Sequence, residues 1–252
     1  MRTEATPPCA ILSARQSGAS VVYRLLATLL PGRAVGSEPF RWTEPLGEVS
    51  RRFHAGEPAV ARELLRAALG QAAFFHHNFD AESGPFNQML LDALADAGYR
   101  IIRVRRDDSR EHLFSRYLRA SLPCADAAAV ARWRERLAGG HALPPIDAAE
   151  VRSSVQADID YFRWFDAEFA ARALPTLTCT HGELFRSGIA ALATVDALFD
   201  WAGLPARAAR LDDAAVLRLL FHGEHHTGGL RAYSDELAKA RGWIDALVAD
   251  AG

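Results

Sequence analysis

The sequence predicts an α/β fold in three layers, with a central parallel β-sheet flanked by helices. Short apolar or β-branched runs alternate with longer amphipathic stretches along the chain. This pattern is typical of parallel strands joined by crossover helices. A length of 252 residues suits one α/β domain. We therefore expect a single domain over residues 1–252, with residues 1–7 disordered.

Turn residues bound the elements expected in the first half of the chain. Pro31-Gly32 ends the first helix, and Gly70 and Gly98 follow the next two, because glycine readily adopts the conformation that ends many helices. In chain order we expect a strand over 9–13, a helix over 21–30, a loop over 33–42, a helix over 58–69, a strand over 72–79 and a helix over 85–97.

The second half of the chain opens with its clearest strand, over 99–104, which is rich in β-branched residues. Asp108 or Ser109 follows it as the N-cap of the next helix, because a short side-chain oxygen satisfies the free N–H groups there. The remaining expected elements are helices ending near 122, over 126–137 and over 147–174, a strand over 176–180, and helices over 186–202 and 235–248.

The charge balance excludes some classes of partner. The formal net charge is −2, and Lys239 is the only lysine. No overall positive field attracts a nucleic acid or an anionic membrane, so we expect neither as a partner. Any anion site must be built from arginine, hydroxyl groups and backbone N–H groups.

The cysteines predict a reducing, cytoplasmic compartment. Cys9, Cys124 and Cys179 are odd in number, far apart and without a C-x-x-C pair. We expect them to be small buried or semi-buried residues. Arg15 interrupts the first apolar run, and no uncharged apolar stretch approaches 18 residues. The sequence therefore predicts neither a signal peptide nor a transmembrane segment.

The first motif with chemical meaning is the loop over 13–20, between the first strand and the first helix. Its sequence is Ser-Ala-Arg-Gln-Ser-Gly-Ala-Ser. A glycine turn at a helix N-terminus presents backbone N–H groups to an anion, and the helix dipole favours negative charge there. The loop lacks the G-x-x-x-x-G-K-[ST] pattern of nucleoside triphosphatases. An ordinary strand-to-helix turn is the alternative.

The second motif lies at the end of the clearest strand. Arg105 and Arg106 precede a helix that carries Ser115, nine positions after Arg106, or about two and a half helical turns. An arginine at the strand end and a hydroxyl on the helix can together hold one phosphate. A solvated arginine-rich edge with local aspartate pairs is the alternative.

At these two segments the chain resembles the sulfotransferases that use 3′-phosphoadenosine 5′-phosphosulfate (PAPS). In that family a first loop of the form [KR]-[ST]-G-[ST]-[ST] grips the 5′-phosphosulfate. A later strand ends in arginine, which holds the 3′-phosphate with a serine on the next helix. Residues 11–20 look like the first loop, and residues 101–107 with Ser115 look like the second. The resemblance implies a sulfotransferase fold similar to that of P-loop proteins.

Three further segments follow in the family's order, so the resemblance is spread over residues 9–204. Residues 37–40 (Ser-Glu-Pro-Phe) resemble the G-E-P-F stretch of bacterial carbohydrate sulfotransferases. Residues 180–185 resemble the Y-E-D-L stretch before a late helix, and residues 198–204 resemble the F-L-G-L ending of that helix.

The resemblance implies PAPS as co-substrate, 3′,5′-ADP (PAP) as product, and no metal. The positions that it assigns to the donor are Arg15, Gln16, Ser17, Gly18, Ala19, Ser20, Arg105, Arg106 and Ser115, with Arg231 on a C-terminal loop. The first loop departs from the family, because Gln16 occupies the cation position and Ala19 replaces a hydroxyl. Either Arg15 substitutes for the missing cation or the donor site is weakened.

Three residues compete for the role of the general base that takes the acceptor's proton. Glu38 aligns with a glutamate assigned that role in some bacterial carbohydrate sulfotransferases, and we rank it first. His76 and His77 lie at a strand end, where other branches of the family place a catalytic histidine. Side chains alternate along a strand, so at most one of the two histidines faces the site. The alternative for Glu38 is a solvent-exposed loop acid. The alternative for His76 and His77 is one core and one surface histidine.

A histidine cluster near the C-terminus has spacing that suits zinc on a helix. It comprises His222, His225 and His226. Gly223 and Gly228 favour a loop, so we expect no metal site.

The sequence therefore predicts a sulfotransferase that moves a sulfuryl group from PAPS to a hydroxyl of a carbohydrate, glycolipid or small metabolite. One alternative is a degenerate sulfotransferase fold that binds a nucleotide or protein without turnover, which Gln16 and Ala19 favour. A kinase-like phosphotransferase is the second alternative. The absence of a loop lysine argues against it.

Overall fold

The computed structural model describes residues 7–30, 32–122, 127–185, 188–204, 211–221 and 234–251. Contacts divide the chain into two units. The first is Met1–Arg105 with Phe165–Phe221, and the second is Arg106–Trp164 with His222–Gly252. A single domain over residues 1–252 stays a prediction.

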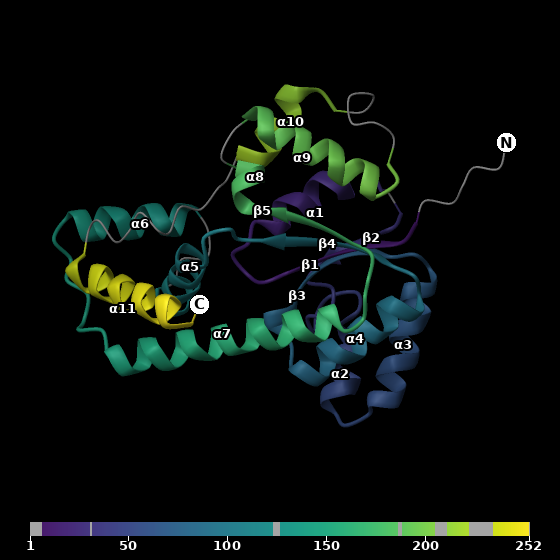
Figure 1. Ribbon diagram of the computed structural model, residues 1–252, viewed down its shortest axis with the longest axis horizontal. Helices are drawn as coiled ribbons and strands as arrows, with labels where there is room; N and C mark the ends of the chain where they lie inside the picture. The colour runs from purple at the N-terminus through teal and green to yellow at the C-terminus, as the bar shows by residue number, and fades with distance from the viewer. Residues whose placement is uncertain are drawn as a thin grey trace. The chain divides into compact units, whose positions relative to one another are not determined.

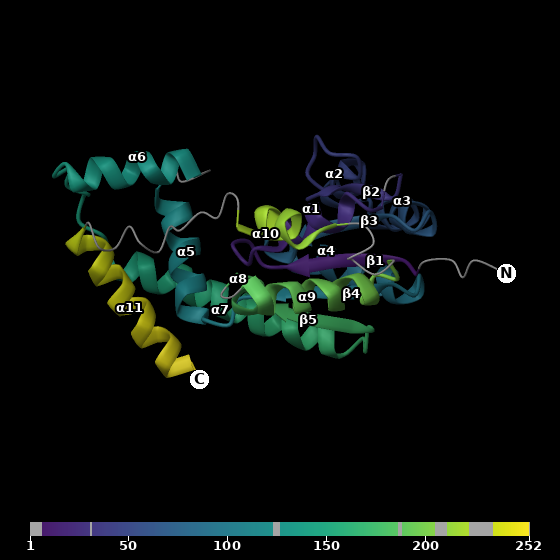
Figure 2. The ribbon, with the colours of Figure 1, turned by 90° about the horizontal axis from the view of Figure 1, so that it is seen from above.

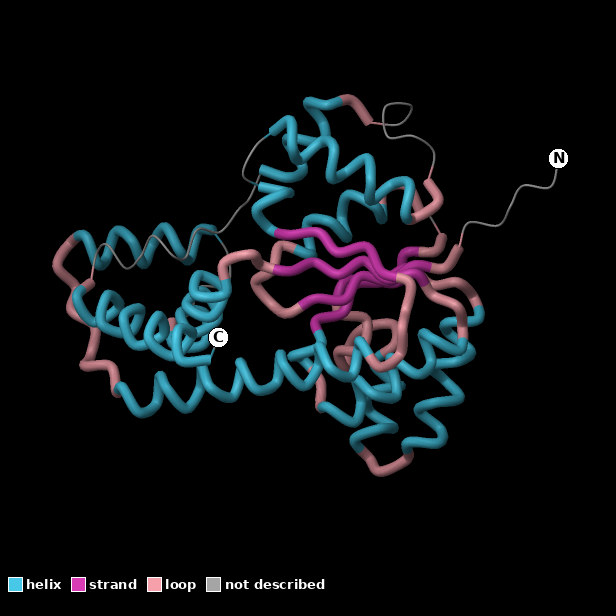
Figure 3. The backbone as a smooth tube through the Cα atoms, in the orientation of Figure 1, coloured by secondary structure: helices cyan, strands magenta, loops and turns pink. Residues whose placement is uncertain are grey.

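The first unit contains a five-stranded parallel sheet in the order β2-β3-β1-β4-β5 (Figure 3). The predicted α/β class with a parallel sheet is confirmed. The strands are β1 (Cys9–Ser13), β2 (Ala34–Ser37), β3 (Phe74–Asn78), β4 (Arg100–Arg105) and β5 (Thr176–Thr180). All except β2 lie where the sequence predicts a strand.

The prediction of a loop over 33–42 is wrong, because β2 occupies part of it. This edge strand has four residues, pairs only with β3 and has a register shift between Ala34 and Gly36. A strand this short and this exposed has no alternating hydrophobic pattern that could be detected in the sequence.

Helices cover both faces of this sheet (Figure 1). One face carries α1 (Ala19–Ala27), α8 (His181–Phe185), α9 (Gly188–Trp201) and α10 (Asp213–Phe221), and the other carries α2 (Gly47–His54), α3 (Pro58–Gly70) and α4 (Gly84–Asp96). α1 packs on β1 and β3, whereas α9 packs on β5 (Figure 2). The sequence did not predict α2, α8 or α10, which are short helices.

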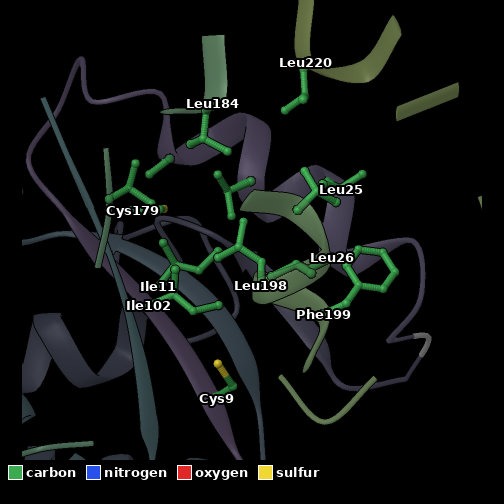
Figure 4. Packing of buried hydrophobic residues seen from close by; sticks show 14 of the residues in the cluster. Cys9, Ile11, Leu25, Leu26, Ile102, Cys179, Leu184, Leu198, Phe199 and Leu220 are labelled. Atoms are coloured by element: carbon green, nitrogen blue, oxygen red, sulfur yellow. The ribbon is translucent and has the colours of Figure 1, made fainter. Parts of the chain in front are cut away.

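A large hydrophobic cluster joins the sheet to α1, α9 and α10 (Figure 4). Its fully buried members include Ile11, Leu25, Leu26, Ile102, Leu198, Phe199 and Leu220. Each such side chain contributes about 1.5–3 kcal/mol over an exposed one. Cys9 and Cys179 belong to the same cluster, and burial raises the pKa of each thiol to about 12. Both are buried as expected, and Cys124 lies outside the described residues.

The second unit is helical. Its helices are α5 (Ser109–Ser121), α6 (Ala127–Ala138), α11 (Asp235–Ala251) and the larger part of α7 (Ala148–Ala170), which the unit boundary divides. Asp108 caps α5, because its carboxylate accepts from the N–H groups of Arg110 and Glu111 at 3.0 Å. Within the described ranges, no helix is both long and apolar enough to span a membrane.

The order of the strands indicates where a ligand is expected to bind. The connection through α1 leads from β1 to β2 on one side, whereas the connection through α4 leads from β3 to β4 on the other. Ligands of open α/β sheets bind at the carboxyl ends of the strands where the connections diverge in this way. In the first unit this position holds the ends of β1, β2 and β3, where Ser13 pairs with Asn78 and Ser37 pairs with His76.

Candidate active site

The loop between β1 and α1 is shaped to expose backbone N–H groups. Gly18 precedes α1 with φ 91°, and no side chain from the described residues caps the helix there. A Cβ at Gly18 would lie 2.6 Å from the ring of Phe185, so both the backbone and the space require glycine. Gln16 also has a positive φ, of 68°. The N-terminus of α1 therefore keeps N–H groups directed at the loop.

Ser17 adds a hydroxyl to this loop. The residue is 1% exposed, and its Oγ finds no hydrogen-bond partner within the described ranges. A buried hydroxyl without a partner is unfavourable by about 1–3 kcal/mol, and an anion in the loop is a natural acceptor for it. Ala19 is buried in the core cluster, so packing explains the absence of a hydroxyl there. Ser20 is exposed.

Arg15 is held by Asp80, which follows β3. The backbone N–H of Arg15 donates to Asp80 Oδ1 at 2.8 Å, and Nε donates to Oδ2 at 3.0 Å. Nη2 donates to the carbonyl of Asp80 at 2.7 Å. The Asp80 side chain is 4% exposed and that of Arg15 is 53% exposed. The charge predicted to replace the missing loop cation is thus already balanced by a carboxylate.

His76 lies in a chain of polar groups that joins three strands. Ser13 Oγ donates to Asn78 Oδ1 at 2.8 Å and therefore accepts from Nε2–H of His76 at 2.9 Å. Nδ1 of His76 then accepts from Ser37 Oγ at 2.8 Å. Burial lowers the pKa of His76 to about 3. Both ring nitrogens are engaged in structural hydrogen bonds, which favours another residue as the base.

Glu38 follows β2 in a conformation that is strained for a residue with a side chain, with φ 62°. Its backbone N–H donates to the His76 carbonyl at 2.7 Å, and its Oε1 accepts from the Asn78 N–H at 2.8 Å. The side chain is only 16% exposed, so it is not the solvated loop acid considered above. Burial raises the pKa of Glu38 to about 7, although the Asn78 hydrogen bond opposes the rise. Such a carboxyl is suited to proton transfer at neutral pH.

His77 is also buried, on the opposite face of β3 from His76. Its Nε2 bonds to Asn87 Oδ1 at 3.0 Å, and its ring packs edge-on against Phe40 at 5.3 Å between centroids. In the part of the chain that the structure describes, its Nδ1 has no hydrogen-bond partner. Glu38 Oε2 lies 4.0 Å from this atom. The alternative of one core and one surface histidine is wrong, since both are 1% exposed.

Arg106 and Ser115 meet within the second unit. Nη1 of Arg106 donates to Ser115 Oγ at 3.3 Å, and Ser115 is 2% exposed. The structure brings the two residues together, and their role as phosphate ligands stays a prediction. Arg105 belongs to the first unit, where its Nη2 donates to Asp166 Oδ2 at 3.3 Å.

Other sequence-based assignments fall on residues that the structure does not describe. Arg231 and the histidines at 222, 225 and 226 lie outside the described ranges. Among the residues that are described, no group of three histidine, cysteine or acidic side chains has the arrangement of a metal site.

Three residues that hold Arg15, Glu38 and His77 in place were not predicted from the sequence. They are Asp80, Asn78 and Asn87. Asn78 and Asp80 flank Phe79 at the end of a predicted strand, and polar residues at the carboxyl end of a parallel strand were a usable signal. Asn87 lies on α4 and gave no such signal.

No protein family, no curated protein and no solved structure matches this chain.

Proposed function

We propose that the chain is a PAPS-dependent sulfotransferase whose acceptor is a hydroxyl of a carbohydrate, glycolipid or small metabolite. The observation that carries the proposal is Glu38, a strained and largely buried carboxyl with a pKa of about 7. It follows β2, and the loop over 13–20 follows β1, at the same edge of one sheet. An anion loop and a base at one edge are the two parts that sulfuryl transfer requires.

The residues present are suited to the 5′-phosphosulfate end of the donor. The N–H groups of residues 17–20 and the unpartnered hydroxyl of Ser17 are donors, and the dipole of α1 favours negative charge. Arg106 with Ser115 is proposed separately as the ligand of the 3′-phosphate. That assignment rests on their contact within the second unit.

In the proposed reaction one proton moves to Glu38 and one electron pair moves to the departing phosphate. Glu38 takes the proton of the acceptor hydroxyl, whose oxygen forms a bond to sulfur. The bond between sulfur and the bridging phosphate oxygen breaks, and that oxygen keeps the electron pair. Loop N–H groups and the α1 N-terminus stabilise the charge that develops on the departing phosphate.

The carboxyl of Glu38 must be ionised to act as a base. Because its pKa is about 7, the active fraction rises as the pH rises through neutrality. We expect turnover to increase between pH 6 and about 8 and then to level off.

PAPS turnover with a panel of sugar, glycolipid and small hydroxyl acceptors tests the proposal. Formation of 3′,5′-ADP that depends on both an acceptor and Glu38 supports it. If Glu38→Gln turns over PAPS as fast as the unmodified protein, Glu38 is not the base.

A binding module without turnover is the second candidate, and the pairing of Arg15 with Asp80 favours it. The pair carries no net charge, and Gln16 occupies the family's cation position. A module of this kind binds PAPS or 3′,5′-ADP but transfers no sulfuryl group to any acceptor. No observation on the described residues favours a kinase-like phosphotransferase.

A further inference from the structure

An unusual contact joins Glu38 to His77 in the first unit. Nδ1 of His77 is buried, and no hydrogen-bond partner for it occurs among the residues described. Oε2 of Glu38 lies 4.0 Å from this nitrogen. A hydrogen bond needs a distance shorter by about 1 Å, which requires a rotation of the Glu38 side chain.

Asn87 determines which nitrogen of His77 carries the proton. The amide nitrogen of Asn87 donates to the carbonyls of Phe79, Glu82 and Ser83, at 2.6, 3.4 and 3.2 Å. Its Oδ1 must then face His77, so Nε2 of the histidine is the donor in the 3.0 Å bond between them. Nδ1 is therefore an unprotonated acceptor, 4.0 Å from Oε2 of Glu38.

Burial disfavours the charged form of each group, so their contact is not an ion pair. Burial lowers the pKa of His77, opposed by its bond to Asn87 and by the nearby carboxylates of Glu82 and Asp80. Burial raises the pKa of Glu38. Among its charged neighbours, Asp80 raises this pKa further, whereas Arg15 and Arg41 lower it. A neutral imidazole nitrogen can accept a hydrogen bond from a protonated carboxyl group beside it.

We propose that His77 is a positioning residue for the base: its Nδ1 accepts a hydrogen bond from Oε2–H of protonated Glu38. The inference rests on the proposed role of Glu38. The proton from the acceptor hydroxyl forms an O–H bond on Glu38 and stays there, because Nε2 of His77 already carries a proton and burial disfavours an imidazolium. Asn78 holds Oε1 at the same time, so both carboxyl oxygens are oriented in the protonated form.

The test is a titration of Glu38 by ¹³C NMR of its side-chain carboxyl, in the full chain without any substrate. Glu38→Gln identifies the signal. We expect a midpoint near the pKa of about 7 in the unmodified protein. His77→Gln keeps a donor for Asn87 but removes the Nδ1 acceptor, and it should lower the midpoint by about one pH unit. His77→Asn places an amide oxygen near the Nδ1 position and should restore much of the shift.

His54→Gln is the matched control, because it removes a half-exposed histidine that pairs with Glu82. It should leave the titration of Glu38 unchanged. An identical midpoint in His77→Gln and the unmodified protein overturns the proposal.

If His77→Gln does not fold, ¹⁵N NMR of the unmodified imidazole decides the question. An unprotonated Nδ1 whose shift follows the Glu38 titration supports the proposal, and a protonated Nδ1 overturns it. The readout needs no PAPS. A coupled Glu38 and His77 in a protein that fails to bind 3′,5′-ADP would therefore reject the proposed function and still support this contact.

Discussion

In the loop after β1, the charge of Arg15 is shared with Asp80, whereas at the end of β2 the carboxyl of Glu38 is buried and accepts from a backbone N–H. Both regions lie at the carboxyl edge of one sheet. Asp80 balances the charge of Arg15, so an anion there relies more on the backbone N–H groups and the Ser17 hydroxyl. The second region keeps an ionisable group whose protonation changes near neutral pH. The comparison separates anion binding from proton transfer, and each can be perturbed alone.

The largest effect should come from Glu38→Gln, which keeps the shape of the side chain but removes its basic oxygen. We expect kcat to fall about 10²–10⁴-fold, since a positioned general base contributes on that scale. Affinity for 3′,5′-ADP, measured by calorimetry, should remain nearly the same. Near-normal turnover in Glu38→Gln, with activity abolished in His77→Ala or His76→Ala, would instead identify a histidine as the base.

Arg15→Ala tests the loop and should weaken donor binding or turnover by about 2–4 kcal/mol. The pairing with Asp80 offers two causes for this loss: a missing contact to the phosphate, or an uncompensated carboxylate that repels it. The double variant Arg15→Ala with Asp80→Asn separates them. Recovery of affinity in the double variant indicates charge balance, and no recovery indicates direct contact. An unchanged rate in Arg15→Ala means that the backbone suffices.

The raised pKa of Glu38 predicts how stability depends on pH. Between the ordinary pKa of 4.5 and about 7, the folded protein binds a proton that the unfolded chain has released. The free energy of unfolding should therefore fall as the pH rises through this window, by about 3 kcal/mol from this group. Denaturant titrations at pH 5 and pH 8 measure the loss, and Glu38→Gln should show much less of it. Equal losses in both proteins would contradict the burial of this carboxyl.

The smallest effect should come from Ser17→Ala. The variant removes a buried hydroxyl that lacks a partner, so the Tm of the ligand-free protein should be unchanged or higher. Affinity for 3′,5′-ADP should fall by about 1 kcal/mol, or roughly fivefold. Lower stability with unaltered affinity would show that the hydroxyl serves the fold and not a ligand.

Much of the sheet was predictable from sequence because β1 and β3 are buried runs, whereas β4 and β5 are short runs rich in β-branched residues. The cap at Asp108 and the approach of Arg106 to Ser115 were predictable too, because both depend on local helical geometry. β2 was not, since an edge strand of four residues has no periodicity to detect.

The contacts that define the site depend on tertiary structure. Arg15 and Asp80 are 65 positions apart, and only the pairing of β1 with β3 brings them together. The proton position on His77 follows from Asn87, whose orientation depends on carbonyls after β3. Sequence alone named Glu38 and His77, but it carried no information on their burial or on the contact between them.

Calorimetric comparison of 3′,5′-ADP with 5′-AMP tests the central claim most directly, because the two ligands differ only in the 3′-phosphate. We expect 3′,5′-ADP to bind at least about tenfold tighter, a difference of about 1.4 kcal/mol. The preference should be lost when Arg106 is replaced by alanine, while 5′-AMP affinity is kept. Equal affinity for the two nucleotides, or no binding of either, would contradict the assignment of this chain as a PAPS-dependent sulfotransferase.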